Sequence, residues 1–596
     1  PPAQHFHSFY LSVSRLKWWL LTLGFPNDPG GTRVAVRVGR EAKALDLIPL
    51  PNLINGASTP SSPRNPFSSN SIPPPPLFMT EIFNKLEHTI RDRFRGAKDF
   101  LTGHAPETNV PWHNWAGNQR CTPAKTFHPR TVDDLKGIVK MAKDEGRGIR
   151  CVAEGHSWSS ISNTNGYLVN VTEMDDVVVQ RSDTHGWTVT AGSGATLSKL
   201  DETLKAHNPP LTLVSATVLD NVRVGGIVAT GSHGATTWSR TIPEQVVSMI
   251  IVTADGEEHE FSDEIDLVEM SAARVNLGLL GIIYTVTFRV QPMYHLRMID
   301  FFPPITSWLN AATLKEIVNR SEAVEVFYWP FNSGDLTATH DKLWVKQWVR
   351  TEDPVTQSQD FLRAERIGQQ LSVSFSDKLY EFLPTHPSAT PHLCRLLFEA
   401  GLKSADNVLL APDAIHYQHG IDGIPCWDLE FAFKVNEDFS NVVEGVSMII
   451  DKVYQNAKKN KFPFNLTAEF RLCKSSQAFL SSAYDTDPDA IYCFLEVLAI
   501  KGTGGFDTFS AELGDAWMKQ FGARPHWAKM WEHVPGVHAR LRTQPGNADR
   551  FAKFDTVRRK YDPKGMFFGN PSLKAVLLGE KLPSGFNSKA VAGFKR

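Results

Sequence analysis

The 596-residue sequence has few cysteines, no excess of charge of either sign and no long apolar run. Its six cysteines are scattered without a Cys-x-x-Cys pair, so we predict neither a bound metal nor a disulfide framework, and a reducing compartment is favoured. The 62 Lys and Arg residues are balanced by 64 Asp and Glu residues, which gives no reason to expect a nucleic-acid partner. A bilayer span needs roughly 18 to 20 apolar residues. Residues 18–25 are the nearest candidate and are far too few, so we expect no integral membrane segment.

The first 78 residues contain little that could be buried. They hold no methionine and no acidic residue before Asp28, and residues 49–76 are rich in Pro, Ser and Asn. Such a stretch cannot offset its ordering entropy, so we expect 1–78 to be a disordered leader. Its basic start would suit a transit-peptide remnant, but an extension without function is the simpler interpretation because the first methionine is Met79. Cytoplasmic and mitochondria-associated locations both stay open.

The length predicts more than one domain. An amphipathic helix is expected within 79–110. Residues 111–295 then interleave helix and strand signals, and residues 296–545 alternate aromatic and polar positions, which is typical of antiparallel sheet with one covered face. Residues 546–596 form a last segment. We therefore predict an α+β fold in which a domain of interleaved helices and strands is followed by a second domain built on a large antiparallel sheet with flanking helices.

Local signals place several elements in the first of these domains. Thr131 and Asp134 form a variant capping box before a helical face, and Gly146 is a stop signal. A short strand over 149–153 leads into a turn that contains His156. The Asp255-Gly256 pair between two apolar runs predicts a hairpin.

Three glycine-rich segments, 155–157, 224–234 and 277–283, carry the strongest functional signals. Glycines let successive backbone N–H groups converge on a phosphate and let backbone lie flat against a ring. Taken singly, each segment is more often a tight structural turn. A nicotinamide-dinucleotide fold is disfavoured, because Gly192-Ser193-Gly194 lacks the third glycine and does not follow a first βα turn.

The order and spacing of five motifs decide between these interpretations. The motifs are Asn114-Trp115-Ala116-Gly117-Asn118, Pro129-x-Thr131-x-x-Asp134-Leu135, Gly155-His156-Ser157, Gly225-Gly226-x-x-Ala229-Thr230-Gly231-Ser232-His233-Gly234 and Leu277-Gly278-x-Leu280-Gly281-Ile282. Together they resemble the FAD-binding (PCMH-type) domain of vanillyl-alcohol-oxidase-type flavoproteins, and among these the sugar-1,4-lactone oxidase and alditol oxidase branch. The resemblance runs from Asn114 to the C-terminus, where residues 546–596 resemble the segment that returns to the FAD domain.

The resemblance implies an FAD cofactor whose 8α-methyl group is bonded to His156. The alternative is a histidine that only caps the turn, since some relatives bind FAD without this bond. No cysteine lies between Cys151 and Cys394, which excludes the second, cysteine-based bond of some relatives. Glu154 departs from the Gly-Ser-Gly-His-Ser pattern and would repel a pyrophosphate, so we expect it to point outward. The residues implied to surround FAD are Gly155, His156, Ser157, Trp158, Ser159, Gly225, Gly226, Thr230, Ser232, Gly281 and Ile283.

The second half carries two motifs that lactone oxidases share. Glu469 and Arg471 alternate on a predicted strand, so both point to one face. Such a pair is usually a surface ion pair, but it can also orient hydroxyls and stabilise negative charge. Pro525-His526-Trp527-Ala528-Lys529 is similar to a Pro-His-Trp-Gly-Lys segment whose lysine faces the reacting carbon. The catalytic residues that the resemblance implies are Glu469, Arg471, His526 and Lys529.

The implied reaction is oxidation of a CH–OH group, with hydride transfer to flavin N5 and with Lys529 or His526 as general base. Molecular oxygen is the expected acceptor and hydrogen peroxide the product. Tyr492 stands where alditol oxidases place a histidine, which favours a sugar lactone such as D-arabinono-1,4-lactone over a polyol such as xylitol. Thr217, or Ala216 if one gap is allowed, falls where family oxidases carry a small residue. A branched residue there would favour a lactone dehydrogenase with another acceptor.

One further alternative for the function stays open at this point. A flavin- or sugar-binding protein without turnover would also carry the glycine-rich motifs. The oligomeric state is not indicated by any pattern in the sequence.

Overall fold

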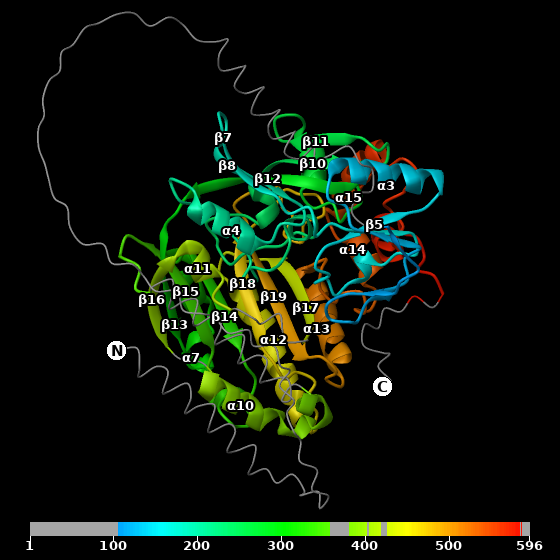
Figure 1. Ribbon diagram of the computed structural model, residues 1–596. Coiled ribbons are helices and arrows are strands. Elements are labelled where there is room, and N and C mark those ends of the chain that lie inside the picture. Colours follow the sequence, from blue (N-terminus) through cyan, green and yellow to red (C-terminus); the bar gives the residue numbers. More distant parts are fainter. Residues whose placement is uncertain (1–104, 358–380, 402–403, 419–425, 585, 587–596) are drawn as a thin grey trace, which may run out of the picture. The chain divides into compact units, whose positions relative to one another are not determined.

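The computed structural model describes residues 105–357, 381–401, 404–418, 426–584 and 586, all of them within the compact unit Arg91–Arg596. The predicted leader, residues 1–78, and the helix expected within 79–110 lie outside the described residues, apart from 105–110. No helix in the described part of the chain is both long and apolar enough to cross a bilayer. The predicted α+β fold is confirmed: helices alternate with strands in the first half, and one large antiparallel sheet dominates the second (Figure 1).

A four-stranded sheet begins the first half. Its strands, in spatial order, are β1 (Glu107–Thr108), β4 (Lys125–Phe127), β6 (Tyr167–Asn170) and β5 (Ile149–Val152). Strands β4 and β5 both pair in parallel with β6. The crossover helix α3 (Val132–Asp144) begins at the predicted capping box, in which Thr131 accepts a hydrogen bond from Asp134 N–H and the Asp134 side chain accepts one in return.

A second sheet holds the predicted hairpin. Its strands are β11 (Glu258–Ser262), β10 (Val246–Val252), β12 (Ile282–Pro292), β8 (Gly186–Gly192) and β7 (Val177–Ser182), with β9 (Leu211–Leu213) paired to the end of β12. Val252 pairs with Glu258 around the Asp255-Gly256 turn, which confirms the hairpin. Strand β12 ends at Pro292, which stands at the last position of the ladder, opposite Leu211.

Eight antiparallel strands form the sheet of the second half. In spatial order they are β16 (Ala405–Leu410), β13 (His295–Phe301), β15 (Trp344–Thr351), β14 (Ala323–Tyr328), β18 (Ala468–Lys474), β19 (Ile491–Ile500), β17 (Cys426–Lys434) and β20 (Arg524–Pro525). In Figure 1 the upper ends of β18, β19 and β17 lie next to the first half.

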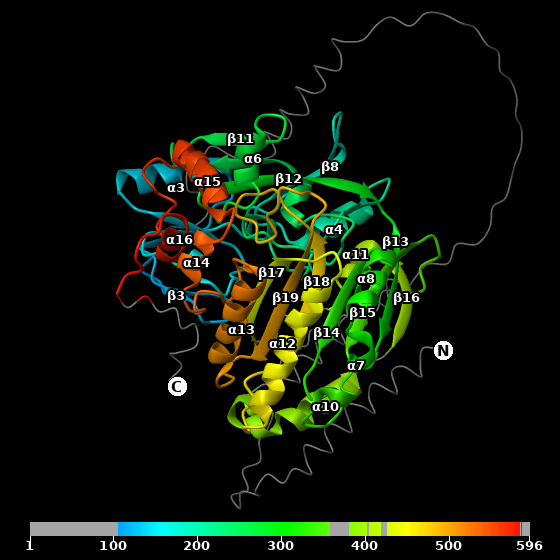
Figure 2. The same cartoon turned by 180° about the vertical axis from the view of Figure 1, so that it is seen from behind.

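Long helices cover one face of this sheet, and acidic side chains occupy the other. The helices are α8 (Ala311–Arg320), α12 (Ser440–Ala457) and α13 (Phe506–Phe521) (Figure 2). On β17 the rings of Phe431 and Phe433 pack against Trp517 and Phe521 of α13, at centroid distances of 6.2 and 4.8 Å. Because strand side chains alternate between faces, the even-numbered positions of β17 point away from these helices.

The remaining α-helices and strands complete the described fold. The helices are α4 (Leu197–Ala206), α5 (Val224–Ala229), α6 (Leu267–Ala273), α7 (Ile305–Trp308), α10 (Thr390–Gly401), α11 (Ala411–Ile415), α14 (Val537–Thr543), α15 (Asn547–Tyr561) and α16 (Pro571–Leu577), and the remaining strands are β2 (Trp112–His113) and β3 (Arg120–Cys121).

The C-terminal segment returns to the first half through a buried arginine. Arg150 of β5 donates to the carbonyl oxygens of Ile161 (2.7 Å), Leu277 (2.7 Å), Gly278 (3.2 Å) and Phe567 (3.0 Å). Burial lowers its pKa to about 10, so it stays charged at neutral pH. One side chain therefore ties together a turn, the third glycine-rich segment and the C-terminal segment.

Candidate active site

A cavity of about 320 Å³ lies where the glycine-rich segments meet the acidic face of the eight-stranded sheet. Nearly all of the site residues expected from the sequence line it, and Ser159 alone is not among the described residues that do. Those in the lining are Gly155, His156, Ser157, Trp158, Gly225, Gly226, Thr230, Ser232, Gly281, Ile283, Glu469, Arg471, His526 and Lys529. The fold therefore brings residues more than 370 positions apart in the sequence to one cavity.

Two of the lining glycines leave no space for a side chain, and a third faces open space. A Cβ on Gly225 would lie 2.8 Å from Cβ of Ser193, and one on Gly281, at φ +154°, only 2.3 Å from the Val252 carbonyl oxygen. Gly226 faces the cavity, with no atom within 4 Å of an added Cβ. The buried hydroxyl of Ser193, also in the lining, has no hydrogen-bond partner among the described residues. A glycine cradle with an unsatisfied polar group fits a large ligand such as FAD.

The turn that carries His156 is held by backbone and aromatic contacts. Gly155 adopts φ +73°, which favours glycine, and its carbonyl oxygen accepts a 2.8 Å hydrogen bond from Trp115 N–H. The imidazole of His156 stacks on the Trp115 indole, with ring centroids 5.2 Å apart. Ser159 instead donates its hydroxyl to the Trp527 carbonyl oxygen at 2.6 Å. It joins this turn to the 526–529 segment rather than lining the cavity.

Glu154, the departure from the family pattern, has a partner. Its carboxylate lies 2.9 Å from Nε of Arg223, the residue that precedes α5, and both line the cavity. Arg223 also donates to the Gly194 carbonyl oxygen at 2.8 Å. Glu154 is exposed, as expected for a side chain that points outward, and its negative charge beside the expected pyrophosphate position is compensated by a guanidinium.

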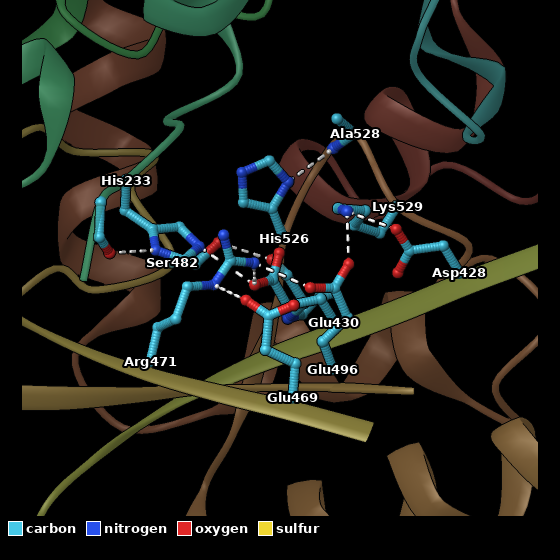
Figure 3. Close-up of polar contacts among 12 residues, drawn as sticks. His233, Asp428, Glu430, Glu469, Arg471, Ser482, Glu496, His526, Ala528 and Lys529 are labelled. Carbon is cyan, nitrogen blue, oxygen red and sulfur yellow. Dashed lines mark hydrogen bonds and ion pairs between the residues drawn. The ribbon is translucent and has the colours of Figure 1, made fainter. Parts of the chain in front are cut away.

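Two cations and four carboxyl groups gather on the sheet side of the cavity (Figure 3). Arg471 contacts Glu469 at 2.9 Å, Glu430 at 3.0 Å and Glu496 at 2.7 Å. Lys529 contacts Glu496 at 2.6 Å and also Asp428. The strand register explains the gathering, because Glu469 and Glu430 stand opposite Glu496 on either side of β19.

The four carboxyl groups differ in ionisation because their neighbours differ. Burial raises the pKa of Asp428 and of Glu469 well above the usual range, so both favour the neutral acid. For Glu430 burial acts in the same direction, but His233 and Arg471 outweigh it and hold its pKa well below the usual range. Lys529 and Arg471 likewise outweigh burial at Glu496 and lower its pKa.

The basic groups do not titrate near neutral pH. Burial alone would lower the pKa of Lys529, but its close contacts with Asp428 and Glu496 outweigh burial and raise the pKa. Burial lowers the pKa of His526 to about 3. His526 Nδ1 accepts a 3.3 Å hydrogen bond from Ala528 N–H, so its proton is on Nε2. Lys529 is therefore an ammonium and His526 a neutral donor, which differs from our expectation that one of them is the general base.

His233, Glu430 and His526 approach one another closely enough to hold a metal ion, with ligand atoms within 4.8 Å. Their hydrogen bonds favour another arrangement. Nε2 of His233 faces Oε1 of Glu430 at 3.0 Å, and Arg471 contacts the same oxygen. Because Nε2 of His526 carries a proton, a metal would have to displace both an arginine and that proton.

Asp428, Glu430, Glu496 and His233 are site residues that the sequence reasoning missed. The signal was present: Asp428 and Glu430 are spaced by two within an apolar strand, where an acid is buried only with a partner. Tyr492, used above to choose between lactone and polyol, is not among the described residues lining the cavity, and its hydroxyl contacts Asp485 and the Tyr484 carbonyl oxygen. Thr217 lines the cavity, whereas Ala216 is not in the described lining.

Comparison with protein families decides the affiliation. Residues 123–262 match the model of the FAD binding domain, and residues 286–575 match the model of D-arabinono-1,4-lactone oxidase. The chain therefore carries an FAD binding domain followed by a region that matches the D-arabinono-1,4-lactone oxidase family. In this family context the two matches meet at the cavity, since the first contains His156 and Gly226 and the second contains Arg471 and Lys529.

Relatives of the lactone oxidase family match almost over their full length. The L-gulonolactone oxidase of Scyliorhinus torazame is 26% identical, covering 77% of this chain and 96% of the relative. The D-arabinono-1,4-lactone oxidase of Eremothecium gossypii is 23% identical, with 78% and 94% covered. The L-gulono-1,4-lactone dehydrogenase of Mycobacterium tuberculosis is 26% identical, with 77% and 97% covered. A solved cholesterol oxidase of B. sterolicum shares the fold, with a TM-score of 0.66 at 16% identity over 80% of this chain and 98% of that one.

Proposed function

We propose that this protein is an FAD-dependent oxidase of a sugar-1,4-lactone such as D-arabinono-1,4-lactone, with molecular oxygen as acceptor and hydrogen peroxide as product. The observation that carries the proposal is that Arg471 and Lys529, whose side chains are only 11% and 16% exposed, line the same cavity as the glycine cradle. Relatives of similar length are named as lactone oxidases, which supports the substrate class.

FAD, when bound, supplies the two-electron acceptor, and the residues of the cradle would hold it. Gly225, Gly226 and Gly281 leave room for backbone to approach the cofactor, and Arg223 offers a cation beside the diphosphate. We further propose that His156 forms a covalent bond to the flavin. Its ring lines the cavity, and stacking on Trp115 limits its rotation.

Arg471 and Lys529 then act as fixed positive charges. Both stay protonated because carboxylates surround them, so they are suited to stabilise negative charge that develops on the substrate oxygen or the reduced ring. His526, neutral and carrying its proton on Nε2, can donate to a substrate oxygen. These groups need no proton transfer of their own before the reaction begins.

The neutral acids of the site suit an uncharged, hydroxyl-rich substrate. In the acid form Asp428 and Glu469 can each donate one hydrogen bond and accept others, which is the pattern that sugar hydroxyls require. A polyol such as xylitol offers the same groups, and this makes an alditol oxidase the second candidate for the substrate. The names of the relatives favour the lactone.

A dehydrogenase with a non-oxygen acceptor is the second candidate for the oxidative half. The observation that favours it is the branched side chain of Thr217 in the cavity lining, together with one relative named as a dehydrogenase. A flavin- or sugar-binding protein without turnover is disfavoured, because such a protein has no need of two buried cations beside the cofactor.

Oxygen consumption tests the proposal. The purified holoprotein should consume oxygen and form an equal amount of peroxide with D-arabinono-1,4-lactone or L-gulono-1,4-lactone. Turnover with a dye acceptor but not with oxygen would favour the dehydrogenase, and Thr217→Ala should then gain oxidase activity. Absence of lactone turnover with every acceptor would contradict the proposal.

A further inference from the structure

The oxidation of an alcohol releases a proton as well as a hydride, and the residues named above leave that proton without an acceptor. Lys529 already holds its proton, and burial makes His526 a weak base whose Nδ1 accepts a backbone hydrogen bond. Glu469 favours the neutral acid. On the sheet side of the cavity, the ionised carboxylates within the described residues are Glu430 and Glu496.

The two carboxylates differ in the oxygens that they leave available. Glu496 uses both, since Oε1 faces Lys529 and Oε2 faces Arg471. Glu430 uses only Oε1, which is 3.0 Å from Arg471 Nη2 and 3.0 Å from His233 Nε2. No described residue donates to its Oε2. This oxygen therefore keeps its lone pairs for a ligand.

His233 fixes the orientation of Glu430. Nδ1 of His233 is 3.0 Å from the carbonyl oxygen of the next residue, Gly234. The His233 ring stacks on Phe494 at a centroid distance of 3.5 Å. The ring can therefore neither flip nor swing away without losing these contacts. With Oε1 held from two sides, the position of Oε2 is determined.

We propose that Oε2 of Glu430 is the proton acceptor of the reaction and that His233 is its positioning residue. This inference rests on the proposed function. In the step, the substrate C–H bond breaks and its electron pair leaves as hydride to the flavin. The O–H bond breaks and its proton moves to Oε2 of Glu430, while a C=O bond forms. The substrate is oxidised by two electrons, the flavin is reduced by two, and the carboxylate becomes a carboxylic acid.

A carboxylate of low basicity is adequate for this role. As hydride leaves, the hydroxyl becomes the conjugate acid of a carbonyl, which is a very strong acid, so the transfer to a carboxylate is downhill late in the step. Arg471 and Lys529 remain in place to compensate the charges that are left.

The test is the rate of flavin reduction under anaerobic conditions, mixed with L-gulono-1,4-lactone in a stopped-flow instrument. Glu430→Gln keeps the hydrogen bond from Arg471 but cannot take a proton, so the limiting rate should fall at least about 100-fold, the usual contribution of a general base. The apparent affinity for the lactone should change by less than about tenfold, and the flavin content should change by less than about twofold. Glu430→Asp should recover part of the rate.

Glu469→Gln is the matched comparison. Because Glu469 already favours the neutral acid, an isosteric amide should reduce the limiting rate much less than Glu430→Gln does. The inference would be overturned if both variants lost the same factor in the limiting rate of flavin reduction. It would also be overturned if Glu430→Gln reduced its flavin at the wild-type rate.

Wild-type protein gives a second measurement that does not depend on the folding of a variant. With Glu430 as acceptor the limiting rate should stay flat from neutral to alkaline pH, because this carboxylate is ionised throughout. A rate that rises through the alkaline range would assign the proton to the lysine and overturn the inference. Failure of the lactone to reduce wild-type flavin at all would instead contradict the proposed function.

Discussion

Three acidic residues stand side by side in the large sheet. Glu496 of β19 faces Glu469 on one side and Glu430 on the other, and the two ionised residues, Glu430 and Glu496, stand directly opposite one another, which by itself destabilises a sheet. Arg471, whose side chain is only 11% exposed, contacts all three acidic side chains. A single guanidinium therefore makes this cluster of acids compatible with folding, and the same group gives the cavity its positive charge.

Replacement of Arg471 should cost both stability and activity. Arg471→Met leaves buried carboxylates without their partner, so the free energy of unfolding should fall by about 3–5 kcal/mol. Arg297→Met is the matched control, because the Arg297–Asp406 pair is about half exposed. Urea unfolding should show a large loss for the first variant and a small one for the second. Similar losses in both would mean that the buried cluster is not held by Arg471.

The bond to the cofactor is also a property of one residue. If His156 carries the flavin, acid precipitation of the wild-type protein should give a yellow pellet, and His156→Ala should give a colourless one. His185→Ala is a suitable control, because this histidine contacts Glu264 at the surface. A yellow pellet from His156→Ala would place the bond elsewhere, and a colourless wild-type pellet would exclude it.

At the scale of the element, the glycine segments show why local patterns were informative. The capping box of α3 and the hairpin of β10 and β11 depend on residues close in sequence, and both were predicted correctly. Several glycines of the motifs adopt backbone conformations that other residues rarely adopt, and their place in the cavity lining could be predicted. Which side of β17 faces the cavity could not, because the apolar run around Trp427 and Phe433 hid the two acids between them.

The register between strands was beyond the sequence as well. Glu430 and Arg471 are 41 residues apart and meet only because β17 and β18 both pair with β19. The His233 contact to Glu430 spans 197 residues and joins the two halves of the chain. Side-chain partners at such separations follow from tertiary packing, for which no local pattern gives a signal.

A methyl group at Gly281 should disturb the cradle. In Gly281→Ala the added Cβ would lie only 2.3 Å from the Val252 carbonyl oxygen, and alanine would be forced into an unfavourable φ. Stability should therefore fall by about 1–3 kcal/mol, and flavin content should fall with it. Gly504→Ala, with no atom within 4 Å of the added Cβ, is the control. Thermal unfolding and the flavin-to-protein absorbance ratio report both effects. Unchanged flavin content in Gly281→Ala would mean that this segment does not hold the cofactor.

At the scale of the molecule, a buried histidine joins the two halves. His416, which follows α11, lies 2.9 Å from Asp201 of α4 and 3.0 Å from the Val218 carbonyl oxygen, next to Thr217 in the cavity lining. Burial would lower its pKa, but Asp201, the Val218 carbonyl and Asp220 outweigh it and raise the pKa. The charged form of His416 is therefore favoured in the folded protein.

This contact predicts the pH dependence of stability. Because the folded-state pKa is above the unfolded value, the stabilisation is complete at pH values below the unfolded pKa and is lost as the pH rises through the folded pKa. Urea unfolding of wild type and His416→Gln should be measured from pH values below the unfolded pKa to values above the folded pKa. The difference in the free energy of unfolding between the two proteins should shrink as the pH rises. A difference that grows with pH would contradict the assignment.

The central claim is that a sugar lactone delivers a hydride to a flavin held between the glycine cradle and the pair formed by Arg471 and Lys529. Anaerobic addition of D-arabinono-1,4-lactone or L-gulono-1,4-lactone to the purified yellow protein, with xylitol as the comparison, tests it most directly. The lactone should bleach the flavin absorbance within the time of one turnover. Xylitol should leave the absorbance unchanged. A flavin that keeps its colour with both lactones, or a folded protein that carries no flavin, would contradict the account.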